Sequence, residues 1–432
     1  YTLHIVRTLR FDYETGTSIS WPFQNAGSFE MFTLYNGAGE ISIDVIRDNT
    51  KFYILIDGNC VAMFEIPEID GLSTKVALAS NNNTVTRFSE YSVTEEDVTV
   101  PTTFKLNSEV DGTLNHGGVQ YSYYGYQKAG LYYEFSADVQ VTADGTGQAG
   151  ILYAIDGESG TNSTTARYSL QLDAGNGNDT ARTVMGLRMI NRNNNWPFEA
   201  SAATFEHRIA YQRTDVVTLK IIRDNDKFYM YANGQFLTVV HLASMKDVPT
   251  YIGFTTREET ITYNNVTLIE HEAPVDCSAD FIQSSYAVPG NVDVRFVSTG
   301  TVTVSATLSN FTVGAGTGRK VAIDFIANGQ NDKLGLDIPM NSGVYCIAGT
   351  WKNATAFGTT LFDVANPPES VTIKVKREIT NNKAVYTMWI NNQEIDFSAR
   401  PAESTFTGPV KGIKFAVENM SMTVSDVVVE FE

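Results

Sequence analysis

Hydrophobic and polar residues alternate along short segments of this chain, and polar turns separate the segments. In residues 131–141, every second residue from Tyr133 onwards is apolar, so these side chains fall on one side of an extended chain. Apolar residues do not recur at helical spacing over any useful length. Turns rich in glycine and aspartate, such as residues 143–145, bound the segments. The pattern predicts an all-β chain of antiparallel strands.

One hairpin pattern occurs three times. Residues 222–235 read Ile-Arg-Asp-Asn-Asp-Lys-Phe-Tyr-Met-Tyr-Ala-Asn-Gly-Gln, which predicts two strands joined by a tight polar turn, then a second turn at Asn233-Gly234. The same pattern occurs at residues 46–58, where Arg47 stands 176 residues before Arg223. A diverged copy with a longer loop lies in residues 375–393. The chain is therefore predicted to repeat at the scale of whole domains.

The repeat divides the chain into three related units. We assign residues 1–94 to the C-terminal half of a jelly-roll β-sandwich, 103–270 to a complete sandwich and 280–432 to a third, diverged one, with linkers at 95–102 and 271–279. The first unit looks incomplete because it has no counterpart of the segment that precedes Tyr168 in the second. Either a preceding portion lies outside this sequence, which we favour, or a neighbouring chain completes the domain.

These residues resemble a known superfamily. Long antiparallel strands, tight Asn-Gly or Asp-Gly turns and the Arg-Asp-Asn-Asp-Lys-Phe-Tyr hairpin are similar to the concanavalin A-like lectin/glucanase superfamily, which includes laminin-G-like domains. The resemblance covers all three units and implies tandem antiparallel jelly-roll β-sandwiches. It does not select a function, because that superfamily includes lectins, carbohydrate-binding modules, adhesins and glycosidases.

The net charge and the lack of long apolar runs exclude some classes of partner, and the cysteines allow two states. A net charge of −18 disfavours nucleic acid, which requires a basic surface. No apolar run approaches the ~20 residues of a membrane span, so we expect no direct insertion into a membrane. The three cysteines do not form a disulfide framework. Cys277 and Cys346 could pair, or all three, including Cys60, could be buried thiols.

We expect no catalysis. Glucanases that share the resemblance carry a Glu-x-Asp-x-Glu strand, and this sequence contains none; residues 394–396, Glu-Ile-Asp, have the spacing of one pair only. The five histidines are scattered, with no pair at the spacing of a metal site.

Aromatic residues beside polar ones are the candidate ligand site, because an aromatic ring packs on the apolar face of a sugar while polar groups bind its hydroxyls. Trp196 follows Arg192, Asn193 and Asn194, and Trp21 and Trp351 also precede the hairpin of their units in loop-like sequence. These tryptophans could instead anchor long loops on the core. Tyr124 and Tyr126 belong to a tyrosine-rich segment that could bind a ligand or fill the core.

One loop is a weak candidate for calcium. Residues 173–179 offer Asp173, Asn176, Asn178 and Asp179 as oxygen ligands, although turns of this composition need no metal.

The sequence therefore predicts a non-catalytic, extracellular or cell-surface adhesion protein that binds a polysaccharide or glycoconjugate through lectin-like modules. Two alternatives stay open. The chain could be a structural subunit of a surface layer or filament that self-associates through its sandwiches, or it could be a glycoside hydrolase or an accessory region of one.

Overall fold

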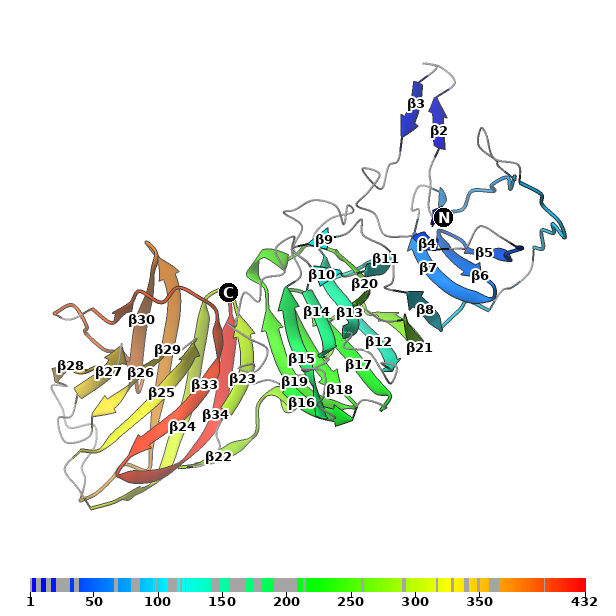
Figure 1. Ribbon diagram of the computed structural model, residues 1–432. Coiled ribbons are helices and arrows are strands. Elements are labelled where there is room, and N and C mark those ends of the chain that lie inside the picture. Colours follow the sequence, from blue (N-terminus) through cyan, green and yellow to red (C-terminus); the bar gives the residue numbers. More distant parts are fainter. Residues whose placement is uncertain are drawn as a thin grey trace.

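The fold is all-β. The computed structural model describes residues 2–4, 9–12, 17–20, 32–34, 39–65, 69–78, 86–95, 97, 99–107, 115–116, 119–120, 122–140, 148–155, 168–173, 181–189, 208–212, 215–257, 260–289, 293–315, 318–327, 330–337, 342–347, 350–356, 365–399 and 401–432. Figure 1 shows two β-sandwiches next to each other, formed by the second and third units, with the strands of the first unit beside the second sandwich.

The second unit packs two six-stranded sheets face to face. One sheet has the order β11 (Ser122–Ala129), β20 (Thr250–Arg257), β13 (Gln148–Ile155), β14 (Tyr168–Asp173), β15 (Ala181–Met189) and β16 (Arg208–Gln212). The other has the order β8 (Phe104–Asn107), β21 (Thr260–Glu270), β12 (Tyr132–Gln140), β17 (Val217–Asp224), β18 (Lys227–Ala232) and β19 (Gln235–His241). A two-stranded sheet, β9 (Asn115–His116) and β10 (Val119–Gln120), and the 3₁₀ helix η3 (Ala243–Met245) complete the unit.

The third unit has the same arrangement. Its first sheet has the order β23 (Asp293–Ser298), β33 (Val410–Glu418), β25 (Lys320–Ala327), β26 (Gln330–Asp337), β27 (Ser342–Ile347) and β28 (Thr350–Ala356). Its second sheet has the order β22 (Ser285–Val288), β34 (Met420–Phe431), β24 (Val302–Val313), β29 (Ser370–Thr380), β30 (Lys383–Ile390) and β31 (Gln393–Glu394), and β32 (Glu403–Ser404) pairs with β30. The helix α1 (Ser278–Phe281) precedes it.

The two sandwiches correspond strand for strand in chain order, and all pairings within each are antiparallel. This arrangement confirms the predicted fold class of antiparallel jelly-roll β-sandwiches. The turns also behave as predicted, because Asn225, Asn233 and Gly234 all have positive φ.

The first unit contributes seven strands: β1 (Thr2–His4), β2 (Leu9–Asp12), β3 (Thr17–Ser20), β4 (Phe32–Leu34), β5 (Ile43–Asp48), β6 (Lys51–Ile56) and β7 (Asn59–Glu65). β5, β6 and β7 form the predicted hairpin and its continuation. The sequence of residues 84–93 resembles that of residues 260–269 and predicts a closing strand for the first unit. This prediction is wrong, since the described residues 86–95 form no strand. In the second unit, the corresponding strand β21 pairs on both sides, with β12 and with β8. A segment without such partners has its backbone N–H and C=O groups hydrogen-bonded to water instead of to neighbouring strands.

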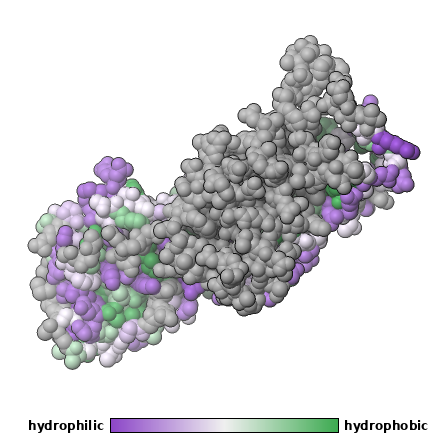
Figure 2. All heavy atoms as spheres, in the orientation of Figure 1, coloured by the Kyte–Doolittle hydropathy of each residue, from purple (hydrophilic) through white to green (hydrophobic). Residues whose placement is uncertain are grey.

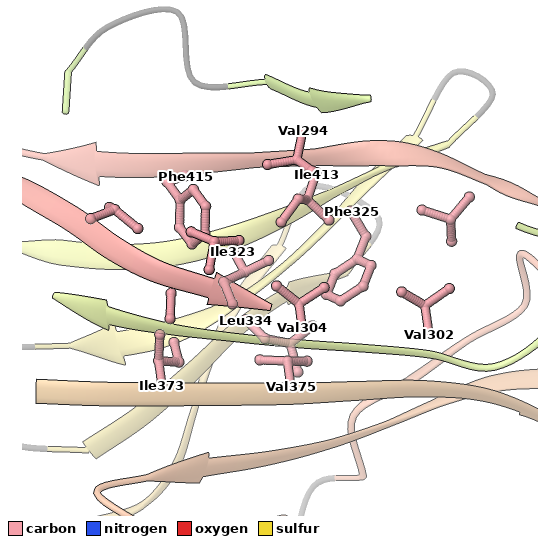
Figure 3. Close-up of a cluster of buried hydrophobic side chains, with 14 of the residues drawn as sticks. Val294, Val302, Val304, Ile323, Phe325, Leu334, Ile373, Val375, Ile413 and Phe415 are labelled. Atoms are coloured by element: carbon pink, nitrogen blue, oxygen red, sulfur yellow. The ribbon is translucent and has the colours of Figure 1, made fainter. Parts of the chain in front are cut away.

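The core of each sandwich is formed by the inward half of each alternating strand. Figure 3 shows this in the third unit, where Ile323 and Phe325 of β25 and Leu334 of β26 face Val304 and Val375 from the opposite sheet. All five are at most 1% exposed. Their burial is the main source of the stability of the sandwich.

The arginine of the hairpin motif holds the segment that follows the hairpin. The Arg223 side chain is 0% exposed, and its Nη2 donates to the carbonyl oxygens of Met245 (3.2 Å) and Val248 (2.6 Å). Its Nε and Nη1 donate to the carbonyls of Asn225 and Gly130 at 2.6 and 3.0 Å. All of these acceptors would be costly to bury without a donor.

The other two copies of the motif use the same clamp. Arg47 donates from Nη2 to the carbonyls of Ile69 (3.3 Å) and Leu72 (2.8 Å), and Arg377 donates to those of Phe406 (3.1 Å) and Gly408 (2.9 Å). The motif is therefore a structural signature of the fold.

A continuous sheet joins the second and third sandwiches. β19 pairs in parallel with β23, with Val239, Val240 and His241 opposite Phe296, Val297 and Ser298. His241 is 0% exposed, and its Nδ1 lies 2.8 Å from Ser298 Oγ while its Nε2 lies 3.4 Å from Asp226 Oδ2. Its ring stacks on Phe431 with centroids 5.0 Å apart.

Side chains on the outer face of β17–β19 complete this junction. Ile222, Tyr229, Tyr231 and Val239 are each at most 8% exposed and pack in one cluster with Phe281 and Phe296 of the third unit. The Tyr231 hydroxyl donates to Asp280 Oδ2 at 2.9 Å. We call this surface the docking face of the second sandwich.

Candidate functional site

Most of the predicted ligand residues lie outside the described residues. These are Trp21, Arg192, Asn193, Asn194, Trp196, Asn176, Asn178 and Asp179. The backbone of Asp173 ends β14. Tyr124 and Tyr126 lie in β11, where their backbones pair with Phe254 of β20 and Phe64 of β7. The predictions for these residues stay predictions.

Trp351 is the predicted ligand residue that can be placed in full. The prediction that it lies in a loop is wrong, because Trp351 belongs to β28 and pairs with Cys346 of β27. Among the described strands, β28 pairs only with β27 and so lies at the edge of its sheet. An edge strand with a polar outer face needs no apolar alternation, which is why its sequence resembles a loop. The Trp351 side chain is 38% exposed.

A transverse row of side chains leads from Trp351 across the sheet. Trp351 pairs with Cys346, Cys346 with Lys333 of β26, and Lys333 with Asp324 of β25. Paired residues share one face of a sheet, and the residues that alternate with them, such as Ile323 and Phe325, face the core. The row therefore lies on the outer face. There, Lys333 Nζ lies 3.5 Å from Asp324 Oδ2.

A second polar row lies farther along the same strands. Ser342, Asp337, Lys320 and Glu418 pair in that order across β27, β26, β25 and β33. Lys320 Nζ lies 3.1 Å from Glu418 Oε2 and 5.3 Å from the centre of the Trp351 ring. The lysine thus links the two rows through a cation–π contact. Within the described part of the chain, the buried Ser342 Oγ has no hydrogen-bond partner.

This outer face combines the groups that carbohydrate recognition requires. Trp351 offers an exposed aromatic surface, and the partly exposed side chains of Lys320, Lys333 and Glu418 lie on the same face. Asp324, Asp337 and Ser342 of the same rows are at most 8% exposed, so they lie beneath this surface. Sequence reasoning missed all but the tryptophan. The available signal was a charged residue at every fourth position of β25, Lys320 and Asp324, in a strand whose other residues are apolar.

The described residues add no candidate for a metal site or for thiol chemistry. Among the described residues, no group of three or more histidine, cysteine, aspartate or glutamate side chains could hold a metal ion. Cys60, Cys277 and Cys346 are all buried, and none of them forms a disulfide, so the suggested Cys277–Cys346 bridge is wrong. In the same part of the chain, no helix has the length and apolarity needed to cross a membrane.

Comparison with known proteins gives similarity of structure only. No family model and no curated protein sequence matches the chain. The carbohydrate-binding module CBM66 from Bacillus subtilis is 12% identical, with a TM-score of 0.24, and the match covers 34% of this chain and 81% of that one. Domains LG4-5 of the mouse laminin α1 chain are 9% identical, with a TM-score of 0.22 and coverage of 71% and 87%.

An endo-β-galactosidase from Clostridium perfringens that releases GlcNAcα1-4Gal is also similar, at 9% identity, a TM-score of 0.26 and coverage of 72% and 70%. The strand order of the two sandwiches confirms the predicted jelly-roll β-sandwich fold. The three proteins differ in function, so the site itself has to carry any functional conclusion.

Proposed function

We propose that this chain is a non-catalytic, extracellular carbohydrate-binding protein with a binding surface around Trp351. The observation that carries the proposal is an exposed tryptophan whose ring contacts the Lys320 ammonium group, with the exposed carboxylate of Glu418 paired to that lysine. A flat aromatic surface in fixed register with hydrogen-bonding groups suits a sugar ring, which has an apolar face and a polar rim.

The carboxylates of this surface support binding rather than hydrolysis. Retaining and inverting glycosidases need two carboxylates free to act as acid, base or nucleophile. Here Asp324 forms an ion pair with Lys333, and Glu418 forms one with Lys320. Incubation with polysaccharides should therefore release no reducing sugar, and sustained release would contradict this part of the proposal.

Trp351→Ala is the test of the binding surface. The wild-type chain should be retarded in gels that contain its polysaccharide, and the variant should bind that polysaccharide about 10- to 30-fold more weakly, since a buried aromatic contact in a complex contributes about 1.5–2 kcal/mol. Affinity electrophoresis over a series of glycan concentrations gives the dissociation constant.

Ile379→Ala is the matched control, because Ile379 is similarly exposed, at 40%, but lies on β29 in the opposite sheet. Unchanged binding by the Trp351 variant, with binding by the wild type intact, would place the site elsewhere. Lack of retardation of the wild type by every glycan would reject carbohydrate binding.

One observation favours self-assembly as a second candidate function. Ile43 and Val45 on β5 are 51% and 58% exposed, and among the described strands β5 pairs only with β6. An exposed edge with apolar residues can add a strand from another molecule. Light scattering of the purified chain should then show concentration-dependent assembly, which Val45→Lys should abolish.

A further inference from the structure

The third sandwich presents an altered version of the docking face. In the second sandwich, Ile222 pairs with Tyr229, and Lys220 pairs with Tyr231. The equivalent pairs in the third sandwich, one and three residues before its clamp arginine Arg377, are Lys376 with Thr387 and Lys374 with Trp389. Two of the buried apolar positions are thus occupied by lysine and threonine, whereas the aromatic position holds a tryptophan.

These residues form part of a polar surface with tryptophan at one side. One row crosses four strands from Val428 of β34 through Ser305 of β24 and Lys374 of β29 to Trp389 of β30. The alternating residues Val304, Val375 and Met388 are 0% exposed, so the row lies on the outer face. Strands about 4.8 Å apart give this row a length of about 14 Å.

The row is accessible from solvent. Lys374 is exposed, Trp389 is partly exposed, and Val428 is 46% exposed. Lys374 Nζ lies 5.7 Å from the centre of the Trp389 ring. The next row places Thr303, Lys376 and Thr387 side by side. Thr303 is only 4% exposed, so the partly exposed Thr387 provides the accessible hydroxyl of this row. Figure 2 shows hydrophobic residues scattered among hydrophilic ones on the visible side of the third sandwich.

The charges on this face nearly balance. Lys376 Nζ lies 3.1 Å from Glu378 Oε2, and Glu394 pairs in register with Trp389 while Glu430 pairs with Thr303. Neither a polyanion nor a polycation would find a complementary field here. A face that only provides solubility has no need of a tryptophan among serines, threonines and lysines.

We infer that the outer face of β24, β29 and β30 binds an uncharged polysaccharide chain, with Trp389 under a sugar ring and the Ser, Thr and Lys side chains bonded to hydroxyls. This inference extends the proposed carbohydrate binding to a second surface, on the sheet opposite Trp351. In this arrangement the sugar chain lies across the strands of the third sandwich, over Trp389. The equivalent surface of the second sandwich, its docking face, packs on the third unit instead.

The experiment uses the full chain carrying Trp351→Ala, so that only the second surface is tested. The probes are mixed-linkage β-glucan, xylan, galactomannan and amylose as uncharged chains, and alginate as a charged one, in affinity gels. At least one uncharged chain should retard the Trp351→Ala protein, and adding Trp389→Ala should weaken that binding at least 10-fold. Adding Ile379→Ala should leave it unchanged, and far-UV circular dichroism should be the same for all variants.

Three results would overturn the inference. Loss of all retardation in the Trp351→Ala protein would leave the proposed function intact and remove the second surface. Retardation by alginate alone would exclude an uncharged ligand. Dimers of the wild type in sedimentation that Trp389→Arg abolishes would show that this face takes a second copy of the chain. Lack of retardation of the wild type itself would instead reject the proposed function.

Discussion

Replacing Arg223 with methionine is expected to destabilise the second sandwich by about 3–5 kcal/mol, because hydrogen bonds to a charged group contribute about 1.5–3 kcal/mol each and several are lost together. Arg223 supplies donors to four carbonyl groups and to Thr250 Oγ1, which lies 2.9 Å from Nη1. Methionine fills a similar volume but leaves the buried oxygens of Met245 and Thr250, and the part-buried carbonyls of Asn225, Gly130 and Val248, without this donor. Urea unfolding followed by tyrosine and tryptophan fluorescence measures the change.

Two further arginines serve as comparisons. Among the described residues, Arg319 donates only to the exposed carbonyl of Gly314, at 3.2 Å from Nη2, so Arg319→Met should change stability by less than about 0.5 kcal/mol. Arg223→Lys should fall between the two variants, because one ammonium group cannot reproduce the planar fork of donors. If Arg223→Met matched Arg319→Met, the clamp would be dispensable.

His241→Ala is expected to uncouple the second and third sandwiches at a cost of about 2–4 kcal/mol, since it removes a buried hydrogen bond, a ring stack and the partner of a buried carboxylate. The His241 ring packs closely against the backbone of Gly300, since a Cβ added to Gly300 would lie 2.8 Å from His241 Cε1. In calorimetry, the unfolding transition that the two sandwiches share should separate into two. His271→Ala is the matched control, because His271 is 28% exposed and contacts only Glu134 at 3.2 Å among the described residues.

The His241→Ala variant should also change how the stability of the protein depends on pH in the acid range. Burial raises the pKa of Asp226, but the neighbouring His241, a backbone hydrogen bond and the charge of Lys227 together outweigh burial and lower the pKa below its ordinary value. A carboxyl with a lowered pKa in the folded state contributes stability above the unfolded pKa of about 3.9, and this contribution disappears as the pH falls through the folded value. The difference in stability between wild type and His241→Ala should therefore shrink below about pH 4. A difference that stays constant down to pH 2 would contradict this assignment.

The hairpin motif made the fold predictable from sequence. The spacing of Arg223 from Asn233-Gly234 fixes one strand pair and two turns, and alternation places Tyr133 and Phe135 in the core. These are local features, in which the partners lie within a few residues of one another. What the motif could not reveal was the role of its arginine, because three of the four carbonyls that Arg223 binds, those of Gly130, Met245 and Val248, lie more than 20 residues away.

The site was less predictable for the same reason. Asp324 and Lys333 pair directly between β25 and β26, but Trp351 is aligned with them only through two further strand pairings, and no spacing in the sequence marks that register. His241 was one of five scattered histidines, and its neighbour Ser298 lies 57 residues farther on in another sandwich. A single sequence shows which residues can form such contacts, but only the topology brings them together.

The parallel pairing of β19 with β23 has a mechanical consequence. If tension were applied along the chain, it would not simply stretch residues 271–279, because the backbone hydrogen bonds between residues 239–241 and residues 296–298 bridge the two sandwiches in parallel with that segment. Bonds loaded together along a strand pair share the force, whereas side-chain contacts give way one by one. We therefore expect that separating the two sandwiches requires a higher force than their side-chain contacts alone would resist. When the sandwiches separate, the chain should lengthen by the segment that connects β19 to β23.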